Sequence, residues 1–134
     1  MTYDIVVSDS KVIDLESGQT AFAEVDATLR TTEARAPAAL IEDATGADAM
    51  IVDASTQVTG DVLRSLDSLR VVGRSGIGVD NIDLETAADL DVPVVNVPDY
   101  CLDEVSTHAL GMLLSCARKL PQLDAGVKEG EWDW

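Results

Sequence analysis

The sequence has few aromatic and basic residues, two cysteines, one histidine and no long apolar run. Aromatic residues make up 4% of its 134 residues, and Lys and Arg together number nine. No apolar run approaches the roughly 20 residues that cross a bilayer, so we expect no membrane-spanning segment. Residues 1–4 show no basic region followed by an apolar stretch, as a signal peptide would, and we therefore expect a cytoplasmic protein.

The two cysteines, Cys101 and Cys116, belong to no CxxC pair and lie near no histidine cluster. This spacing argues against a zinc site, and we predict no metal ligand. In a reducing compartment both are expected to be free thiols. Apolar residues make up 46% of the chain, so a core can form without disulfides or metal, filled mainly by Val, Leu, Ile and Ala.

Acidic residues dominate the charge, which is −16, and Asp outnumbers Glu by about two to one. Disordered acidic tails are poor in apolar residues, whereas here the charge is spread over an apolar-rich chain. The pattern fits a folded protein whose dense surface carboxylates keep it hydrated in concentrated salt, and we hypothesise a halophilic source. Nucleic acid is not an expected partner, because its phosphates would be repelled and the sequence has no basic stripe.

Short apolar runs alternate with helical patterns, which is typical of βαβ units and a parallel sheet. The expected strands are 3–7, 24–29, 49–52, 69–72 and 92–97. The expected helices are 37–43, 59–66, 83–88 and 103–119, and residues 31–33 are also of helix-start type. The fold class is therefore α/β, with a small flavodoxin-like parallel sheet of about five strands followed by a long helix.

The last expected helix is apolar on nearly all sides. One apolar face at helical spacing consists of Val105, Ala109, Met112, Leu113, Cys116 and Leu120, and a second consists of Leu110, Leu114 and Ala117. A helix of this kind is normally buried on several sides, and a small domain can hardly cover it. The pattern predicts a second domain or subunit against it. The two tryptophans, Trp132 and Trp134, are likewise expected to pack against another part of the protein or another subunit.

Ligands on open parallel sheets bind at the carboxyl ends of the strands. The most informative of these ends is Gly73–Gly78, where bare backbone N–H groups can bind a carboxylate or a phosphate. It is not a dinucleotide-binding fingerprint, because Asn81 stands where the third glycine should be. Spacing alone leaves open whether this is a structural turn or a functional loop.

Four segments in order resemble one enzyme family: residues 71–83 (VVGRSGIGVDNID), Ala87-Ala88, residues 92–98 (VPVVNVP) and the helix at 105–114. Together they are similar to the NAD-dependent D-2-hydroxyacid dehydrogenases, nearest to the phosphoglycerate dehydrogenases and the C-terminal-binding-protein group. The resemblance extends from Tyr3 to Trp134 and is most specific from Val71 onward.

The resemblance implies a division into a flavodoxin-like substrate (catalytic) domain at 1–100 and a crossing helix at 101–134. That helix leads into an NAD-binding domain whose remainder is not in this sequence. The family's glycine fingerprint and its catalytic Arg, Glu and His all fall beyond Trp134, so no catalytic residue is expected here. His108 does not match the catalytic histidine, and we expect it to pack or to cap.

The resemblance also implies the site residues for the substrate. Gly76, Ile77 and Gly78 match the loop whose backbone holds the substrate carboxylate close to the nicotinamide. Arg74 matches a position that faces the substrate's distal group. Asp80 and Asn81 are expected to fix the turn and to cap the next helix rather than to touch ligand.

For the cofactor, NAD, the resemblance implies contacts from Ile77, Val105 and Thr107 only. Val105 and Thr107 match the start of the crossing helix, although the family commonly has Glu where Thr107 stands. The helix at 103–120 is also where the family forms homodimers, so we expect a homodimer.

One departure concerns the substrate. Where phosphoglycerate dehydrogenases carry an Arg and, soon after, a Lys for the phosphate, this sequence has Asp53 and Gln57. A carboxylate near a phosphate dianion is repulsive at low effective dielectric, which argues against 3-phosphoglycerate. Drift toward an acidic surface is the other explanation of Asp53.

Three functions remain open. The first is an enzyme portion, inactive alone, whose complete polypeptide transfers hydride between NAD and a small D-2-hydroxy or 2-oxo acid. The second is a stand-alone ligand-binding or protein-interaction module with the same fold. The third, a receiver or flavin carrier, is supported by Ser8-Asp9 and Asp53, but no Lys follows the fifth strand.

Overall fold

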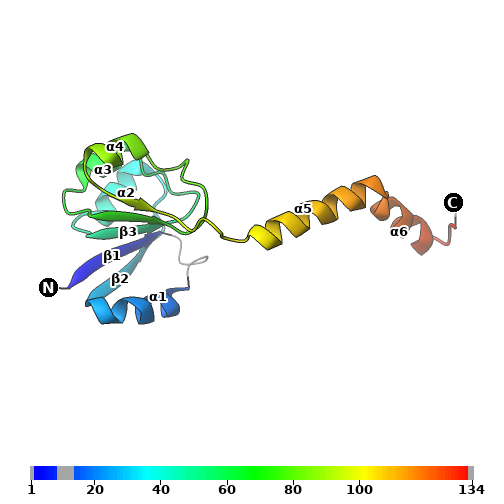
Figure 1. Cartoon of the computed structure of the whole chain (residues 1–134), viewed down its shortest axis with the longest axis horizontal. Helices are drawn as coiled ribbons and strands as arrows, with labels where there is room; N and C mark the ends of the chain where they lie inside the picture. Colours follow the sequence, from blue (N-terminus) through cyan, green and yellow to red (C-terminus); the bar gives the residue numbers. More distant parts are fainter. Residues whose placement is uncertain (1, 9–13, 133–134) are drawn as a thin grey trace. The chain divides into compact units, whose positions relative to one another are not determined.

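The computed structural model describes residues 2–8 and 14–132. The chain divides into two compact units, Met1–Pro98 and Asp99–Trp134. The first holds the sheet and the second holds two helices, as the colours in Figure 1 show.

The first unit is built on a five-stranded, all-parallel sheet with the order β2-β1-β3-β4-β5. Its strands are β1 (Tyr3–Ser8), β2 (Ala27–Thr32), β3 (Ala49–Val52), β4 (Val71–Arg74) and β5 (Val94–Val95). The predicted α/β class and the parallel sheet of about five strands are therefore confirmed. Because all strands run the same way, their carboxyl-terminal loops emerge at one edge of the sheet.

Helices cover both faces of the sheet. Figure 1 shows α2 (Pro37–Ala44), α3 (Gly60–Ser65) and α4 (Leu84–Asp89) on one side and α1 (Leu15–Phe22) on the other. The core between the sheet and α2–α4 is aliphatic, as the scarcity of aromatic residues requires. Its fully buried members include Val6, Leu40, Met50, Val52, Val58, Val62 and Val72.

The helix starts follow local sequence. The side chain of Thr59 accepts a hydrogen bond from the Val62 N–H at the start of α3. Asp83 caps α4 in the same way, accepting from the Thr86 N–H at 3.0 Å and from the Thr86 hydroxyl at 3.0 Å. These two hydrogen bonds hold the pKa of Asp83 below its usual value. Pro37 begins α2, where its missing N–H costs nothing.

The region before β2 differs from the prediction. Helix α1 and the short helix Ala23–Val25 were not expected, and the strand expected at 24–29 begins at Ala27 instead. Ser17 and Gly18 are weak helix formers, which hides α1 in the sequence. The helix start expected at 31–33 is wrong: Thr31 and Thr32 belong to β2, which pairs with β1 along all six of its residues. Tertiary pairing overrides the local preference there.

The second unit contains α5 (Leu102–Ala117) and α6 (Leu120–Lys128), where the sequence predicted one helix at 103–119. The break falls at Lys119, whose φ of 54° is left-handed. Pro121 follows in the first turn of α6, and it cannot donate the hydrogen bond that would continue α5.

No residue of α5 is buried within its own unit. Its exposed apolar side chains include Val105, Leu110, Met112, Leu113 and Leu114. The side chain of His108 is exposed on α5 and forms no hydrogen bond or ion pair with the described residues, so its expected packing or capping role stays a prediction. Cys101 and Cys116 are free thiols, as predicted.

A search of the described residues for helices found none that is both long enough and apolar enough to cross a bilayer. Trp132 is exposed, while Asp9 and Trp134 lie outside the residues that the structure describes.

The core assignment predicts a large effect of a buried truncation. Leu40 is fully buried between α2 and the sheet, so Leu40→Ala should lower the free energy of unfolding by about 2–5 kcal/mol through lost contacts and a residual cavity. Leu84→Ala, on a side chain that is 47% exposed, is the matched control and should change it by less than about 0.5 kcal/mol. Urea unfolding followed by circular dichroism measures both, and equal effects would contradict this core assignment.

Candidate functional site

The carboxyl-terminal loops of β3 and β4 form the two walls of a polar pocket of about 220 Å³. Ala54 and Gln57 come from the loop after β3. The wall after β4 consists of Arg74, Gly78, Asp80 and Asn81. This is the strand edge at which the sequence predicted a ligand.

Arg74 lies over the glycine loop. A Cβ placed on Gly76 would stand 1.6 Å from Nη1 of Arg74 and 2.7 Å from its Cζ, so only glycine permits this arrangement. The Nε of Arg74 is buried and has no hydrogen-bond partner in the described part of the chain. An unpaired buried donor of a charged group is costly, and an acidic oxygen placed beside this atom would remove that cost.

The loop at 76–78 is held by its carbonyl groups. The Val97 N–H donates to the Gly76 carbonyl at 3.0 Å, and Nδ2 of Asn96 donates to the Ile77 carbonyl at 2.8 Å. The N–H groups of Ile77 and Gly78 donate no hydrogen bond to any described residue. Two successive free N–H groups beside a guanidinium form an anion-binding surface. The structure thus places the Arg74 guanidinium beside the loop of Gly76, Ile77 and Gly78.

Asp53 is turned toward its own loop. Its carboxylate accepts hydrogen bonds from the Ser55 N–H (3.1 Å), the Thr56 N–H (2.9 Å) and the Ser55 hydroxyl (2.7 Å). The buried Thr56 hydroxyl is also hydrogen-bonded to Asp53 and to Ser8. Asp53 does not line the Arg74 pocket, whereas Gln57 does. The Asp53 carboxylate therefore stabilises the turn after β3. The residue of this loop that lines the pocket as a polar side chain is Gln57, a neutral amide at the position where a Lys was considered in the sequence.

The remaining predicted residues belong to the second unit. Val105 and Thr107 lie on the first two turns of α5, and both are exposed. The Thr107 hydroxyl donates to the Asp103 carbonyl at 2.6 Å, as a threonine inside a helix commonly does. Within the described ranges, no group of three or more His, Cys, Asp or Glu residues could hold a metal ion.

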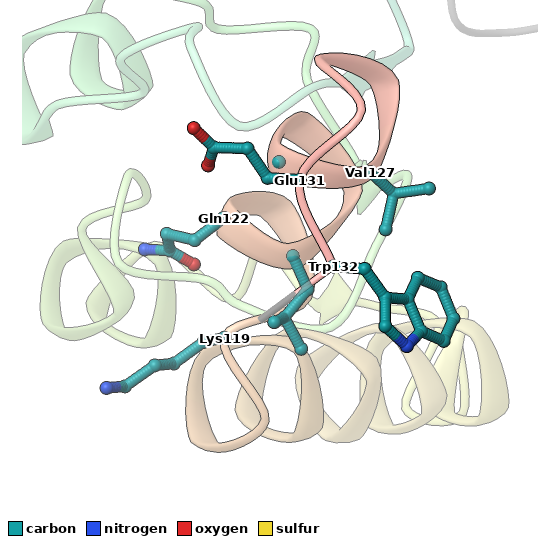
Figure 2. Close-up of a pocket in the computed structure, with 7 residues that line it drawn as sticks. Lys119, Gln122, Val127, Glu131 and Trp132 are labelled. Carbon is teal, nitrogen blue, oxygen red and sulfur yellow. The ribbon is translucent and has the colours of Figure 1, made fainter. Parts of the chain in front are cut away.

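Sequence reasoning did not find the pocket of about 360 Å³ in the second unit. Figure 2 shows Val127 and Trp132 on one side of it and Lys119, Gln122 and Glu131 on the other. The signal available in the sequence was the spacing of Leu123 and Val127, one helical turn apart in α6. A further pocket, of about 450 Å³, is almost wholly apolar and lies on the sheet face beside Phe22.

Comparison with known proteins assigns the family. Residues 5–121 match the catalytic domain of D-isomer specific 2-hydroxyacid dehydrogenases. The chain belongs to this family. D-3-phosphoglycerate dehydrogenase of Methanocaldococcus jannaschii is 44% identical over 94 residues, which are 70% of this chain and 18% of that protein. Hydroxypyruvate reductase of Thermotoga maritima is 35% identical over 86 residues, 64% of this chain and 28% of that protein.

Solved structures of the dehydrogenase family share the fold. D-lactate dehydrogenase from Aquifex aeolicus, complexed with NAD and lactic acid, superimposes with a TM-score of 0.80 at 19% identity, covering 97% of this chain and 38% of that one. NAD-bound 3-phosphoglycerate dehydrogenase of Entamoeba histolytica gives 0.76 at 21% identity, covering 86% and 39%. The resemblance seen in the sequence is confirmed. The chain spans about a fifth of the length of the phosphoglycerate dehydrogenases that it matches.

Gly76→Ala tests whether the 76–78 loop binds an acid. The added Cβ collides with the Arg74 guanidinium, so the arginine must leave its place over the loop. In NMR titrations of the chain with D-glycerate, we expect the amide signals of Ile77 and Gly78 to shift in the wild type. The variant should bind at least about tenfold more weakly, the loss of roughly one charge-assisted hydrogen bond.

Gly73→Ala is the matched control, because its Cβ would meet neighbours only at 3.8 Å, an ordinary contact distance. Its affinity for D-glycerate should stay near that of the wild type. If Gly76→Ala and Gly73→Ala bind equally well, the loop is not the acid site.

Proposed function

We propose that this chain is the acid-binding, N-terminal portion of an NAD-dependent dehydrogenase that moves hydride between the cofactor and a small D-2-hydroxy or 2-oxo acid. The observation that carries the proposal is the pair of free N–H groups at Ile77 and Gly78 beside the unpaired Nε of Arg74. Membership of the family supplies the reaction class. By itself the chain is proposed to be inactive.

In this proposal the N–H groups of Ile77 and Gly78 hold the substrate carboxylate, and Arg74 faces the distal group. The only histidine, His108, is exposed on α5 and is not proposed as the proton-transfer group. The family's catalytic Arg, Glu and His match no residue here, so proton transfer is assigned to residues outside this chain. The role of the chain's own residues is to orient the acid.

In the complete enzyme NAD would accept the hydride from the hydroxy acid, or NADH would donate it to the 2-oxo acid, and this chain offers the cofactor few contacts. The glycine loop after β4 is followed by a turn, and α4 begins only at Leu84, so no helix N-terminus faces the glycines to bind a pyrophosphate. Ile77, Val105 and Thr107 are proposed only as contacts at the edge of the nicotinamide site. The main cofactor site is proposed to lie in a second domain, with 1–100 as the substrate domain and 101–134 as the crossing helix.

The proposed substrate carries no phosphate. Among the described residues that line the pocket, Arg74 is the one cation, Gln57 is a neutral amide and Asp80 is a carboxylate. Within this described lining, one guanidinium and one carboxylate leave no net positive charge for a dianion. The family likeness alone would favour 3-phosphoglycerate, whereas the charge of this pocket favours glycerate-like acids.

We also propose a cytoplasmic homodimer that works in concentrated salt. The free thiols agree with a reducing compartment, and the charge of −16 agrees with a salt-adapted surface. The dimer is proposed to form through the exposed apolar faces of α5. Assays therefore belong in molar KCl, where the repulsion among surface carboxylates is screened.

The exposed apolar surface of α5 also supports a second candidate function. A helix that exposes so many apolar side chains also fits a stand-alone ligand-binding or protein-interaction module. The two functions differ in what the gene product contains beyond the second unit.

The intact mass of the native gene product, taken from its own cells, tests the proposal. A product larger by a second domain of about 150 residues, and active with NADH and hydroxypyruvate, is the expected result. Hydroxypyruvate should be reduced in strong preference to the phosphorylated 2-oxo acid. A product that ends at Trp134 would instead support the binding module and remove the catalytic proposal.

Leu113→Asp tests the dimer. Leu113 is 64% exposed on α5, and a carboxylate at the centre of an apolar interface would be left without a partner. Light scattering should then show monomers in place of dimers. His108→Asp adds the same charge on the polar side of α5 and should leave the assembly size unchanged. An unchanged size for Leu113→Asp would contradict the interface.

A further inference from the structure

The side chain of Asn81 joins the two loops that form the walls of the Arg74 pocket. Its Nδ2 donates to the Asp53 carbonyl at 3.0 Å and to the Thr56 carbonyl at 2.7 Å. A side-chain amide has two N–H donors, so both are committed to the opposite loop. Asn81 thus belongs to the loop after β4, lines the pocket, and is hydrogen-bonded to the loop after β3.

Next to Asn81, the backbone of the two loops forms a short parallel ladder. The Val58 N–H donates to the Asn81 carbonyl at 2.9 Å, and the Asp83 N–H donates to the Val58 carbonyl at 2.9 Å. Val58 and Ile82 form the β-bridge and are buried in the core. The ladder therefore packs into the core through Val58 and Ile82. The Asn81 side chain adds two further hydrogen bonds between the loops at the pocket.

The loop after β3 has both its N–H groups and its carbonyl groups hydrogen-bonded. The N–H groups of Ser55 and Thr56 donate to the Asp53 carboxylate, and the carbonyl groups of Asp53 and Thr56 accept from Asn81. Gln57 follows directly, and it lines the pocket opposite Arg74. The position of Gln57 relative to Arg74 therefore depends on the Asn81 amide.

We propose that Asn81 is a positioning residue that sets the gap between Gln57 and Arg74 and thereby governs recognition of the substrate's distal group. The proposal rests on the proposed function, in which Arg74 faces that group. Only an amide serves here: a carboxylate at 81 would oppose two carbonyl oxygens, and an alanine would leave both without a donor. The carboxylate end of the substrate, bound at Ile77 and Gly78, does not depend on this link.

The test compares two substrates of the complete enzyme: hydroxypyruvate, which has a distal hydroxymethyl group, and glyoxylate, which has none. For Asn81→Asp we expect the KM for hydroxypyruvate to rise about tenfold or more, as for two lost hydrogen bonds, with the KM and kcat for glyoxylate within about twofold of the wild type. Asn81→Ala, which adds no charge, should show the same selective loss.

Asp83→Ala is the matched control. It removes the cap of α4 two residues away and should lower Tm while leaving the ratio of the two KM values unchanged. A rise of equal size for both substrates would mean that Asn81 only stabilises the fold, and no rise would mean that it does not position the wall. Either result overturns the proposal.

A second measurement separates this proposal from the proposed function. If the wild-type enzyme reduces neither acid, the proposed function fails, and the link is tested on the 134-residue chain by amide hydrogen exchange. The amides of Ser55 and Thr56 should then exchange about tenfold faster in Asn81→Ala than in Asp83→Ala. Equal rates in the two variants would overturn the link as well.

Discussion

All five strands run parallel, and this constraint brings the site together. Each strand delivers its carboxyl-terminal loop to one edge of the sheet, so residues far apart in sequence become neighbours without any long-range motif. Gln57 follows β3, Arg74 ends β4, and Asn96 follows β5. The core beneath them is made of short aliphatic side chains on the face covered by α2–α4. That buried base supports the loops above it.

The edge combines satisfied and unsatisfied groups in a way that favours an acidic ligand. The carbonyl groups of Gly76 and Ile77 are held by the residues after β5, which leaves the N–H groups of the loop free. The buried Nε of Arg74 also lacks a partner among the described residues. Leaving such a donor unpaired costs about 1–3 kcal/mol, a cost that an acid with suitably placed oxygens would remove.

The second unit shows the opposite imbalance. The first unit buries an extensive aliphatic core, whereas α5 buries none of its residues within its own unit. Its leucines remain in contact with water, where apolar area is unfavourable by about 25 cal/mol per Å² compared with burial. This surplus of exposed apolar surface is the physical basis for expecting another domain or subunit against α5. It sets α5 apart from α2, α3 and α4, each of which buries one side against the sheet.

Alternation of apolar runs with helical patterns was enough to predict the class, the number of strands and their parallel direction, because β1, β3 and β4 are short apolar runs bounded by polar residues. Local motifs likewise predicted the glycine loop and the helices that begin near Thr59 and Asp83. Sequence could not predict α1 or the true start of β2, since weak helix formers and an edge strand carry little periodic signal. Only the tertiary structure decided that Asp53 turns inward and that Gln57 faces Arg74. Only the tertiary structure, too, showed that Asn81 joins two loops across the pocket. The Asn81 link depends on hydrogen bonds between residues 28 and 25 positions apart, which a linear pattern does not encode.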